Sequence, residues 1–74
     1  MASRHEETRE EVFRAKDDSG REYTIVRYQE WIIDFEGDRI PSLARYALAA
    51  GGAVNRIDND TFEIVSLGVE VKRA

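Results

Sequence analysis

Carboxylates are the most frequent side chains in this chain that could bind a ligand, and two short stretches concentrate them. The stretches are Asp58-Asn59-Asp60-Thr61, with Glu63 beyond it, and Asp34-Phe35-Glu36-Gly37-Asp38. Calcium takes about six to eight oxygen ligands, and its best-known loop has a glycine at the sixth position. Neither stretch reproduces that spacing. We therefore interpret the first as a turn and the second as a solvated loop, and we predict no metal site.

Groups able to activate a nucleophile are scarce. The chain has no cysteine and one histidine, His5, which lies in a charged leader. Catalysis needs an acid, a base or a nucleophile with a partner within reach. Ser19, Ser42 and Ser66 have no evident base, and Gly51-Gly52 is an isolated pair rather than part of a phosphate-binding motif. The sequence therefore predicts no enzyme and no cofactor.

The charge pattern disfavours nucleic acid as a partner. Net charge is −4 with an isoelectric point near 4.9, whereas phosphate backbones are bound by clustered lysines and arginines. The basic residues here are scattered along the chain: Arg14, Lys16, Arg21, Arg27, Arg39, Arg45, Arg56, Lys72 and Arg73. A nucleic-acid surface would need Arg14, Arg27, Arg45 and Arg56 to gather on one face beside exposed aromatic side chains.

The length predicts a single small domain with a marginal core. A chain of 74 residues buries only about 60% of the surface that it exposes when unfolded. Small scaffolds are usually reinforced by disulfides, a metal or a partner chain. Without cysteine, a partner chain is the reinforcement that remains open, unless the core just suffices.

The cellular compartment is predicted from the lack of apolar segments of the kinds that direct a protein to a membrane or to secretion. No apolar run approaches the roughly 20 residues that a membrane span requires, so no membrane partner is expected. The first residues, MASRHEETREE, lack the apolar region of a secretory signal. We expect a cytoplasmic protein, with residues 1–10 as a flexible charged tail and 11–74 as one β domain.

A first hairpin is predicted over residues 11–27. If Asp18-Ser19-Gly20 is a three-residue loop with Gly20 left-handed, opposite charges and apolar side chains face each other across the strands. The expected pairs are Lys16 with Glu22, Phe13 with Ile25, Val12 with Val26 and Glu11 with Arg27. A four-residue loop would oppose Lys16 to Arg21, so the shorter loop is favoured.

The second strand is predicted over residues 21–35 and carries the candidate interaction surface. Its apolar pattern is interrupted at Arg27 and Gln29, which indicates a bulge or bend near Gln29-Glu30. Trp31-Ile32-Ile33 must point to both faces of a sheet, and burying both requires barrel closure or a second chain. Aromatic anchors are also frequent at interfaces. The predicted surface consists of Trp31, Ile33, Phe35, Tyr28 and Tyr46.

Residues 42–50 fit two structures. As a helix, the segment has Ser42 as N-cap and Gly51 as its end, and its alanines favour helix formation. As a strand, it alternates more weakly. Before it, the segment 36–42 is predicted as a loop, because Pro41 cannot join a central ladder.

The last third is predicted to form a second hairpin. With Asn59-Asp60 as a two-residue type I′ turn, Ile57 would face Phe62 and Arg56 would face Glu63. Beyond Ile64 the apolar positions shift phase to Val65, Leu67, Val69 and Val71. A bulge near Ser66, permitted by Gly68, would explain the shift within one long strand over 61–72.

The segment AGGAVNRIDNDTFEIVSLG, together with GREYTI earlier in the chain, resembles short uncharacterised bacterial proteins of similar length. These carry a C-terminal V-N-x-x-D-x-x-T-F-E-I-V hairpin motif. The resemblance implies no activity, cofactor or catalytic residue. It does imply an extended segment before the glycine turn, which favours a strand over 43–50. This chain departs from the family pattern at Ala50-Gly51-Gly52 and at Leu67-Gly68-Val69.

The expected fold is mainly β: a five-stranded antiparallel meander, curled or partly closed into a barrel, with strands near 11–17, 21–35, 43–50, 53–58 and 61–72. The alternative is an α+β fold with four strands and a short helix at 42–50. The expected function is a non-enzymatic protein-interaction module that docks on a protein partner or self-associates as a homodimer. The alternative function is a small barrel that binds a small ligand or nucleic acid.

Overall fold

The computed structural model describes residues 4–74, and in this range the chain forms only strands, turns and loops. The strands are β1 (Arg4–Lys16), β2 (Glu22–Ile33), β3 (Arg39–Leu48), β4 (Ala53–Arg56), β5 (Thr61–Ile64) and β6 (Val69–Arg73). Each strand pairs with the next, and β6 returns to β1 to close a barrel. The prediction of a mainly β small barrel is confirmed, with six strands rather than five. The segment predicted as strand or helix is a strand.

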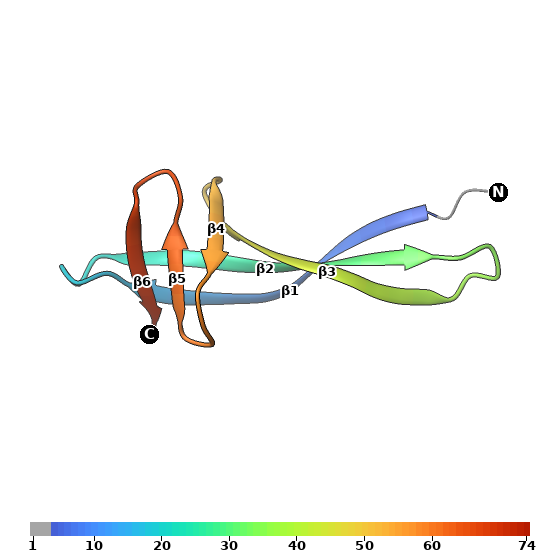
Figure 1. The fold of residues 1–74 in the computed structure, drawn as a ribbon, viewed down its shortest axis with the longest axis horizontal. Helices are drawn as coiled ribbons and strands as arrows, with labels where there is room; N and C mark the ends of the chain where they lie inside the picture. Colours follow the sequence, from blue (N-terminus) through green and yellow to red (C-terminus); the bar gives the residue numbers. More distant parts are fainter. Residues whose placement is uncertain (1–3) are drawn as a thin grey trace.

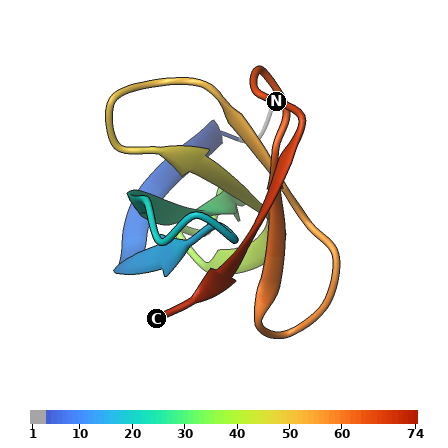
Figure 2. The ribbon, with the colours of Figure 1, turned by 90° about the vertical axis from the view of Figure 1, so that its left-hand side faces the viewer.

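The molecule has a barrel at one end and a projecting arm at the other (Figure 1). Within β3, only Tyr46 and Ala47 pair with β4. Within β1, only Ala15 and Lys16 pair with β6. The parts of β1, β2 and β3 beyond the barrel form a three-stranded sheet. We call this sheet, residues 4–9, 28–33 and 39–45 with the loop 34–38, the arm. Figure 2 looks at the molecule from its barrel end.

The overall dimensions reflect this division. The principal extents are 50 × 20 × 20 Å, and the Cα radius of gyration is 14.7 Å. A compact globule of this length would have a radius of gyration of about 11 Å. The arm therefore extends the molecule instead of folding back onto the barrel.

The core lies inside the barrel and draws on strands from both sides of it. Its buried members are Ala15, Ile25, Val54, Phe62, Ile64 and Val71. The ring of Phe62 lies 5.1 Å from the rings of both Phe13 and Tyr46, between centroids. Aromatic pairs at this separation add to the stability that burial alone supplies.

The first hairpin has the predicted register. Lys16 pairs with Glu22, Phe13 with Ile25 and Glu11 with Arg27. Gly20 is left-handed, with φ of 82°. The Asp17 carboxylate accepts hydrogen bonds from the backbone N–H groups of Ser19 and Arg21. This side chain supports the loop in a way that the sequence analysis did not anticipate.

The tip of the arm repeats that turn. Asp34 accepts hydrogen bonds from the N–H groups of Glu36 and Asp38, and Gly37 is left-handed, with φ of 90°. The loop is therefore shorter than the predicted one over 36–42, because β3 already begins at Arg39. Pro41 pairs with Trp31 inside β3. It is tolerated there because this part of β3 has no strand on its other side.

Two register shifts accompany the passage from barrel to arm. One extra residue lies in β1 between Arg9 and Glu11, and another lies in β3 between Pro41 and Ala44. The second lies opposite Glu30, so the position predicted for a bulge, near Gln29-Glu30, is correct, but the strand predicted to hold it is wrong. The extra residues belong to the neighbouring strands, and the alternation of β2 is unbroken. Bulges of this kind increase local twist and redirect a strand.

The predicted register of the second hairpin is wrong by one residue. Arg56 pairs with Phe62, and Asn55 pairs with Glu63, so the loop comprises Asp58, Asn59 and Asp60. No non-glycine residue of 4–74 has a positive φ, and a type I′ turn needs two. As a result Ile57, predicted to face Phe62, is 53% exposed while Phe62 is fully buried.

The cause is the side chain of Asp58. Its carboxylate accepts hydrogen bonds from the backbone N–H groups of Asp60 and Thr61, at 2.9 and 2.8 Å. These bonds hold the pKa of Asp58 below its ordinary value, the bond from Asp60 contributing most. The stretch turns the chain, as predicted, but as a loop capped by aspartate.

The strand predicted over 61–72 is two strands. β5 ends at Ile64 and β6 begins at Val69, with the N–H groups of Leu67 and Gly68 donating to the carbonyl of Ile64. Gly68 has a φ of 65°, which a residue without Cβ adopts at little cost. The phase shift of the apolar positions marks a reversal of the chain rather than a bulge.

The expectation of a flexible tail over 1–10 is not met where the structure describes the chain. Residues 4–10 belong to β1, and Arg4 pairs with Ile33. Strand pairing with the C-terminal half of β2, which contains Trp31-Ile32-Ile33, provides the order that the charged composition alone does not. Residues 1–3 lie outside the described range.

Candidate interaction surface

On one face of the arm, apolar side chains are left uncovered by the rest of residues 4–74. His5, Ile32 and Ile40 are neighbours in one row across the three strands, and paired residues direct their side chains to the same face. Ile40 is 50% exposed. His5 lies 3.9 Å from the carboxylate of Glu30 on the same face.

The opposite face of the arm is covered by its own polar side chains. The Trp31 indole N–H donates to the Thr8 hydroxyl at 2.8 Å. The Arg39 guanidinium lies over the indole ring, 4.6 Å from its centroid, and 3.7 Å from the carboxylate of Glu6. Such stacking stabilises the pair modestly at exposed sites. Ile33, further along this face, is buried.

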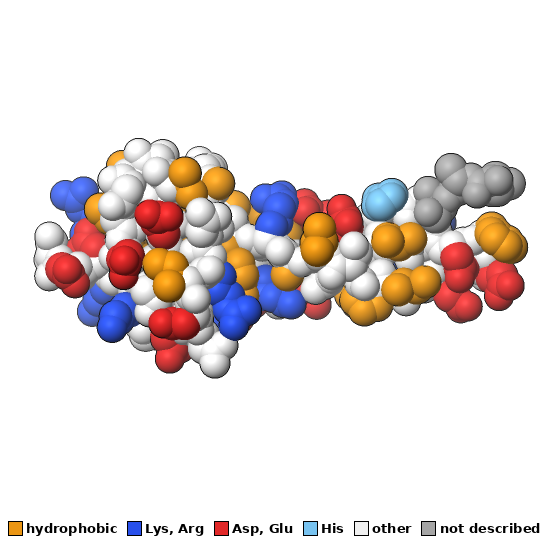
Figure 3. Space-filling model, in the orientation of Figure 1, with side chains coloured by type: hydrophobic (Ala, Val, Ile, Leu, Met, Phe, Trp, Pro, Cys, Tyr) orange, Lys and Arg blue, Asp and Glu red, His pale blue; other side chains and the backbone are white. Residues whose placement is uncertain are grey.

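The most exposed apolar side chains lie at the tip and the free edge of the arm. Phe35 in the tip loop is 81% exposed, and Leu43 in the bulge of β3 is 74% exposed. Figure 3 shows apolar side chains, in orange, along this half of the molecule. An arm that exposes large apolar groups in this way has surface available for a partner.

The five predicted surface residues are not brought together. Phe35 is exposed at the tip, whereas Ile33 is buried. Trp31 and Tyr28 are half-buried, each beneath an arginine. Tyr46 packs on Phe62 in the barrel.

Two exposed residues, Ile40 and Leu43, were missed because 36–42 was predicted as a loop and 42–50 remained ambiguous. The signal that could have found them is the repeat of Asp-x-x-Gly at residues 17–20 and 34–37. A hairpin tip at 34–37 places the next strand directly after it.

A hollow of about 360 Å³ lies where the arm joins the barrel, at the point where β3 leaves β4. It is lined by Arg27, Ala44, Arg45, Tyr46, Val54, Asn55 and Arg56. Three arginines and one aromatic residue thus line the hollow, but Arg45 pairs with Tyr28 and directs its guanidinium over that ring, to the face opposite Arg27 and Tyr46.

The three arginines differ in how their charge is compensated. Arg45 forms two hydrogen bonds with the Glu7 carboxylate, at 2.7 and 2.8 Å, and these hold the pKa of Glu7 below its ordinary value. Arg56 donates to the Asn59 side chain and the Asp58 carbonyl. Arg27 donates to Gln29. Neither Arg27 nor Arg56 forms an ion pair with a carboxylate of residues 4–74.

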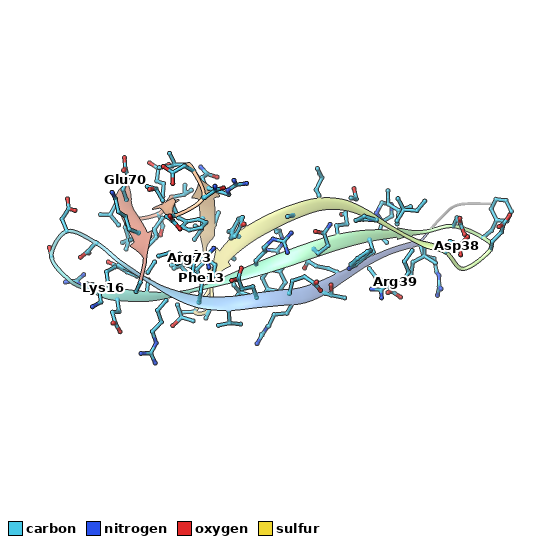
Figure 4. All side chains as sticks on the ribbon, turned by 90° about the horizontal axis from the view of Figure 1, so that it is seen from below. Phe13, Lys16, Asp38, Arg39, Glu70 and Arg73 are labelled. Atoms are coloured by element: carbon cyan, nitrogen blue, oxygen red, sulfur yellow. The ribbon has the colours of Figure 1, made fainter. Side chains whose placement is uncertain are left out.

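Arg27 forms no ion pair with Glu11, its predicted partner, because the carboxylate of Glu11 contacts another arginine. Glu11 pairs with Arg27 in the ladder, but its carboxylate contacts Arg73 at 3.0 Å. Figure 4 shows Arg73 beside Phe13, and its guanidinium lies 3.9 Å from the centre of that ring. Arg14 lies away from the hollow, 3.8 Å from Glu22.

Within residues 4–74, no group of three or more histidine, aspartate or glutamate side chains is placed to hold a metal ion. Over the same range, no helix has the length and apolar character needed to cross a membrane.

The fold and the surface together define a class: a closed antiparallel β-barrel with a three-stranded arm. No protein-family model matches the chain, and searches of curated proteins and of solved structures find no match either. Membership in the family with the V-N-x-x-D-x-x-T-F-E-I-V motif stays a proposal.

Proposed function

We propose that this chain is a non-enzymatic, cytoplasmic protein-interaction module that self-associates through its arm. One observation carries the proposal: Phe35, Leu43 and Ile40 are at least half exposed on an arm that no second layer of residues 4–74 covers. Burying such side chains stabilises an association by roughly 25 cal/mol for each Å² of apolar surface removed from water.

The free edges of the arm favour contact through side chains. β3 carries Pro41 and a bulge at its edge, and β1 carries a run of charged residues from Arg4 to Glu11. Proline, bulges and charges all discourage the addition of another strand. The edges of the arm therefore resist pairing with another strand, while Leu43 and Phe35 remain accessible to a partner.

Sedimentation equilibrium of the intact chain across micromolar concentrations tests this proposal. We expect a monomer–dimer equilibrium that shifts to monomer in Leu43→Glu, because the substitution places a charge in the contact. Val12→Glu is the matched control, since Val12 is a half-exposed β-strand residue outside the arm. A monomer at all concentrations, with no change in Leu43→Glu, would remove the self-association proposal.

A second candidate function, binding of a small ligand or nucleic acid, is favoured by the hollow. Arg27 and Arg56 lie there with Tyr46, whereas the guanidinium of Arg45 is bound to Glu7 and Arg14 lies elsewhere. A positively charged groove with an aromatic ring is the general means of binding single-stranded nucleic acid. Fluorescence anisotropy of a labelled oligonucleotide at low salt tests it, and the absence of any binding there would remove this candidate.

A further inference from the structure

The arm has an acidic loop at its tip and arginines at its base, and the intervening ion pairs Arg39–Glu6 and Arg45–Glu7 are internal to it. The tip carries Asp34, Glu36 and Asp38, and the hollow at the base carries Arg27, Arg45 and Arg56. Figure 3 shows acidic side chains, in red, at the tip and basic side chains, in blue, at the base. Figure 4 places Asp38 at the tip, far from the labelled residues of the barrel.

Part of this charge has no partner within the chain. Asp34 is occupied by the backbone N–H groups of its own loop. Glu36 and Asp38 form no ion pair with any other residue of 4–74, and neither do Arg27 and Arg56. Two unpaired carboxylates at one end of the arm thus match two unpaired guanidinium groups at the other.

We propose that the hollow at the base of the arm receives the acidic tip of a second copy of this chain, in a two-fold dimer with antiparallel arms. A two-fold contact repeats every interaction, because the same patch is used on both copies. An axis across the middle of the arm brings both tips to both hollows at once. The inference rests on the proposed self-association and specifies its geometry.

The exposed apolar side chains of the arm fall within this dimer contact. Ile40 lies between the tip and the hollow and meets the opposite arm, and Leu43 lies nearer the hollow, next to Ala44 of its lining. Phe35 is carried on the same loop as Glu36 and reaches the hollow with it, where Tyr46 provides an aromatic ring. A dimer contact of this design has an apolar centre and charged ends, as many interfaces do.

The shape of the molecule suits the same contact. In Figure 1, β4 stands across the base of the arm, so that β3 and β4 form an inner corner. The hollow lies in this corner, lined by residues of both strands. A narrow tip fits a corner, whereas a broad globular surface would be kept out by the barrel.

Charge reversal with exchange tests the pairing. Arg56→Glu and Glu36→Arg should each weaken the dimer about tenfold or more, because like charges then meet at both ends. Mixing the two variants should restore a heterodimer, since one end then joins the two reversed residues and the other end joins two native ones. Arg14→Glu, on the barrel, should leave the dimer unchanged. Thermal unfolding by circular dichroism should show all variants folded.

The outcomes separate this inference from the proposed function. A wild-type monomer would overturn both. A dimer that Leu43→Glu dissociates, but that neither charge reversal weakens, would overturn the tip-to-hollow pairing and support self-association. Weakening by both reversals without recovery on mixing would also overturn the pairing. Binding of an oligonucleotide by the wild type and its loss in Arg56→Glu would assign the hollow to a polyanion instead.

Discussion

Three of the five turns that join the strands are started by an aspartate, by the same means. Asp17, Asp34 and Asp58 each accept two backbone N–H groups from the loop that follows. The first two loops end with a left-handed glycine, Gly20 or Gly37. The Asp58 loop has no glycine, and there the hydrogen bonds to the carboxylate contribute more to stabilising the turn. A short polar side chain that bonds to its own backbone is thus sufficient to fix a hairpin.

Asp58 gives a prediction for acid pH. Its pKa is lowered in the folded state, chiefly by the hydrogen bond from Asp60, so its contribution to stability is present above its unfolded pKa. That contribution is lost as the pH falls through the lowered folded pKa. Asp58→Asn should therefore be less stable than wild type at neutral pH and show a shallower loss in acid. Urea unfolding at several pH values measures both.

Asp18→Asn is the control for this experiment, because the backbone N–H groups of its loop donate to Asp17 and not to Asp18, and the substitution removes the same charge. An equal effect of both substitutions would mean that net charge, and not the capped loop, sets the acid response.

At the scale of the strands, β2 serves two structures at once. Its first half contributes Ile25 to the barrel core, and its second half is the central strand of the arm. The barrel half is covered by β4, β5 and β6, and the arm half has no such cover. Sheets without a second layer gain less from burial, and such regions open at lower free energy than a core does.

The single tryptophan allows the arm to be observed alone. Trp31 lies in the arm, and the chain has no other tryptophan. We expect the arm to open before the barrel unfolds, so that Trp31 fluorescence changes at a lower urea concentration than far-UV circular dichroism. The measurement is made below the dimerisation range, since a partner on the arm would raise its stability. Coincident transitions would show that arm and barrel unfold as one unit.

The elements that could be predicted from the sequence are those with strong local signals. The Asp-Ser-Gly loop and the charge pairs Lys16–Glu22 and Glu11–Arg27 gave the first register correctly. The second register failed because Asn59-Asp60 resembles a two-residue turn, while the hydrogen bonds of Asp58 favour a longer one. Strand periodicity alone could not distinguish the reversal at Gly68 from a bulge, because both shift the phase of the apolar residues.

The candidate surface was predicted only in part, for a physical reason. Trp31 and Phe35 were recognised from their type, and their position outside the barrel was not. Exposure depends on where β4 and β6 end their pairing with β3 and β1, at Tyr46 and Ala15. That limit is set by three-dimensional closure of the barrel. The gathering of Arg27, Arg45 and Arg56 has the same origin, since the three come from β2, β3 and β4.

At the scale of the whole molecule, stability depends on one small core. The buried cluster belongs to the barrel, and a chain of this size has little stability to spare. Phe62 is fully buried, whereas Phe35 is 81% exposed. Substitutions of these two phenylalanines therefore test the core and the arm separately.

Phe62→Ala should cost about 3 to 5 kcal/mol, which is enough to unfold much of the protein at ambient temperature. Phe35→Ala should leave the unfolding free energy of the monomer unchanged and weaken self-association. Urea unfolding measures the first effect and sedimentation the second. A large loss of monomer stability in Phe35→Ala would mean that the tip packs on the rest of the chain.

The placement of the bulges has a consequence for changes in chain length. β1 and β3 each hold one surplus residue opposite β2, near Glu10 and at Ser42-Leu43, while β2 runs without interruption. Deleting one residue at either bulge would remove the bulge from β1 or β3 and leave the rest of the molecule in place. Adding one to β2 beyond Ile25 would invert the remainder of that strand, moving Trp31 away from Thr8 and turning Ile32 inward. The strand that is shared by barrel and arm is therefore the one whose length is fixed.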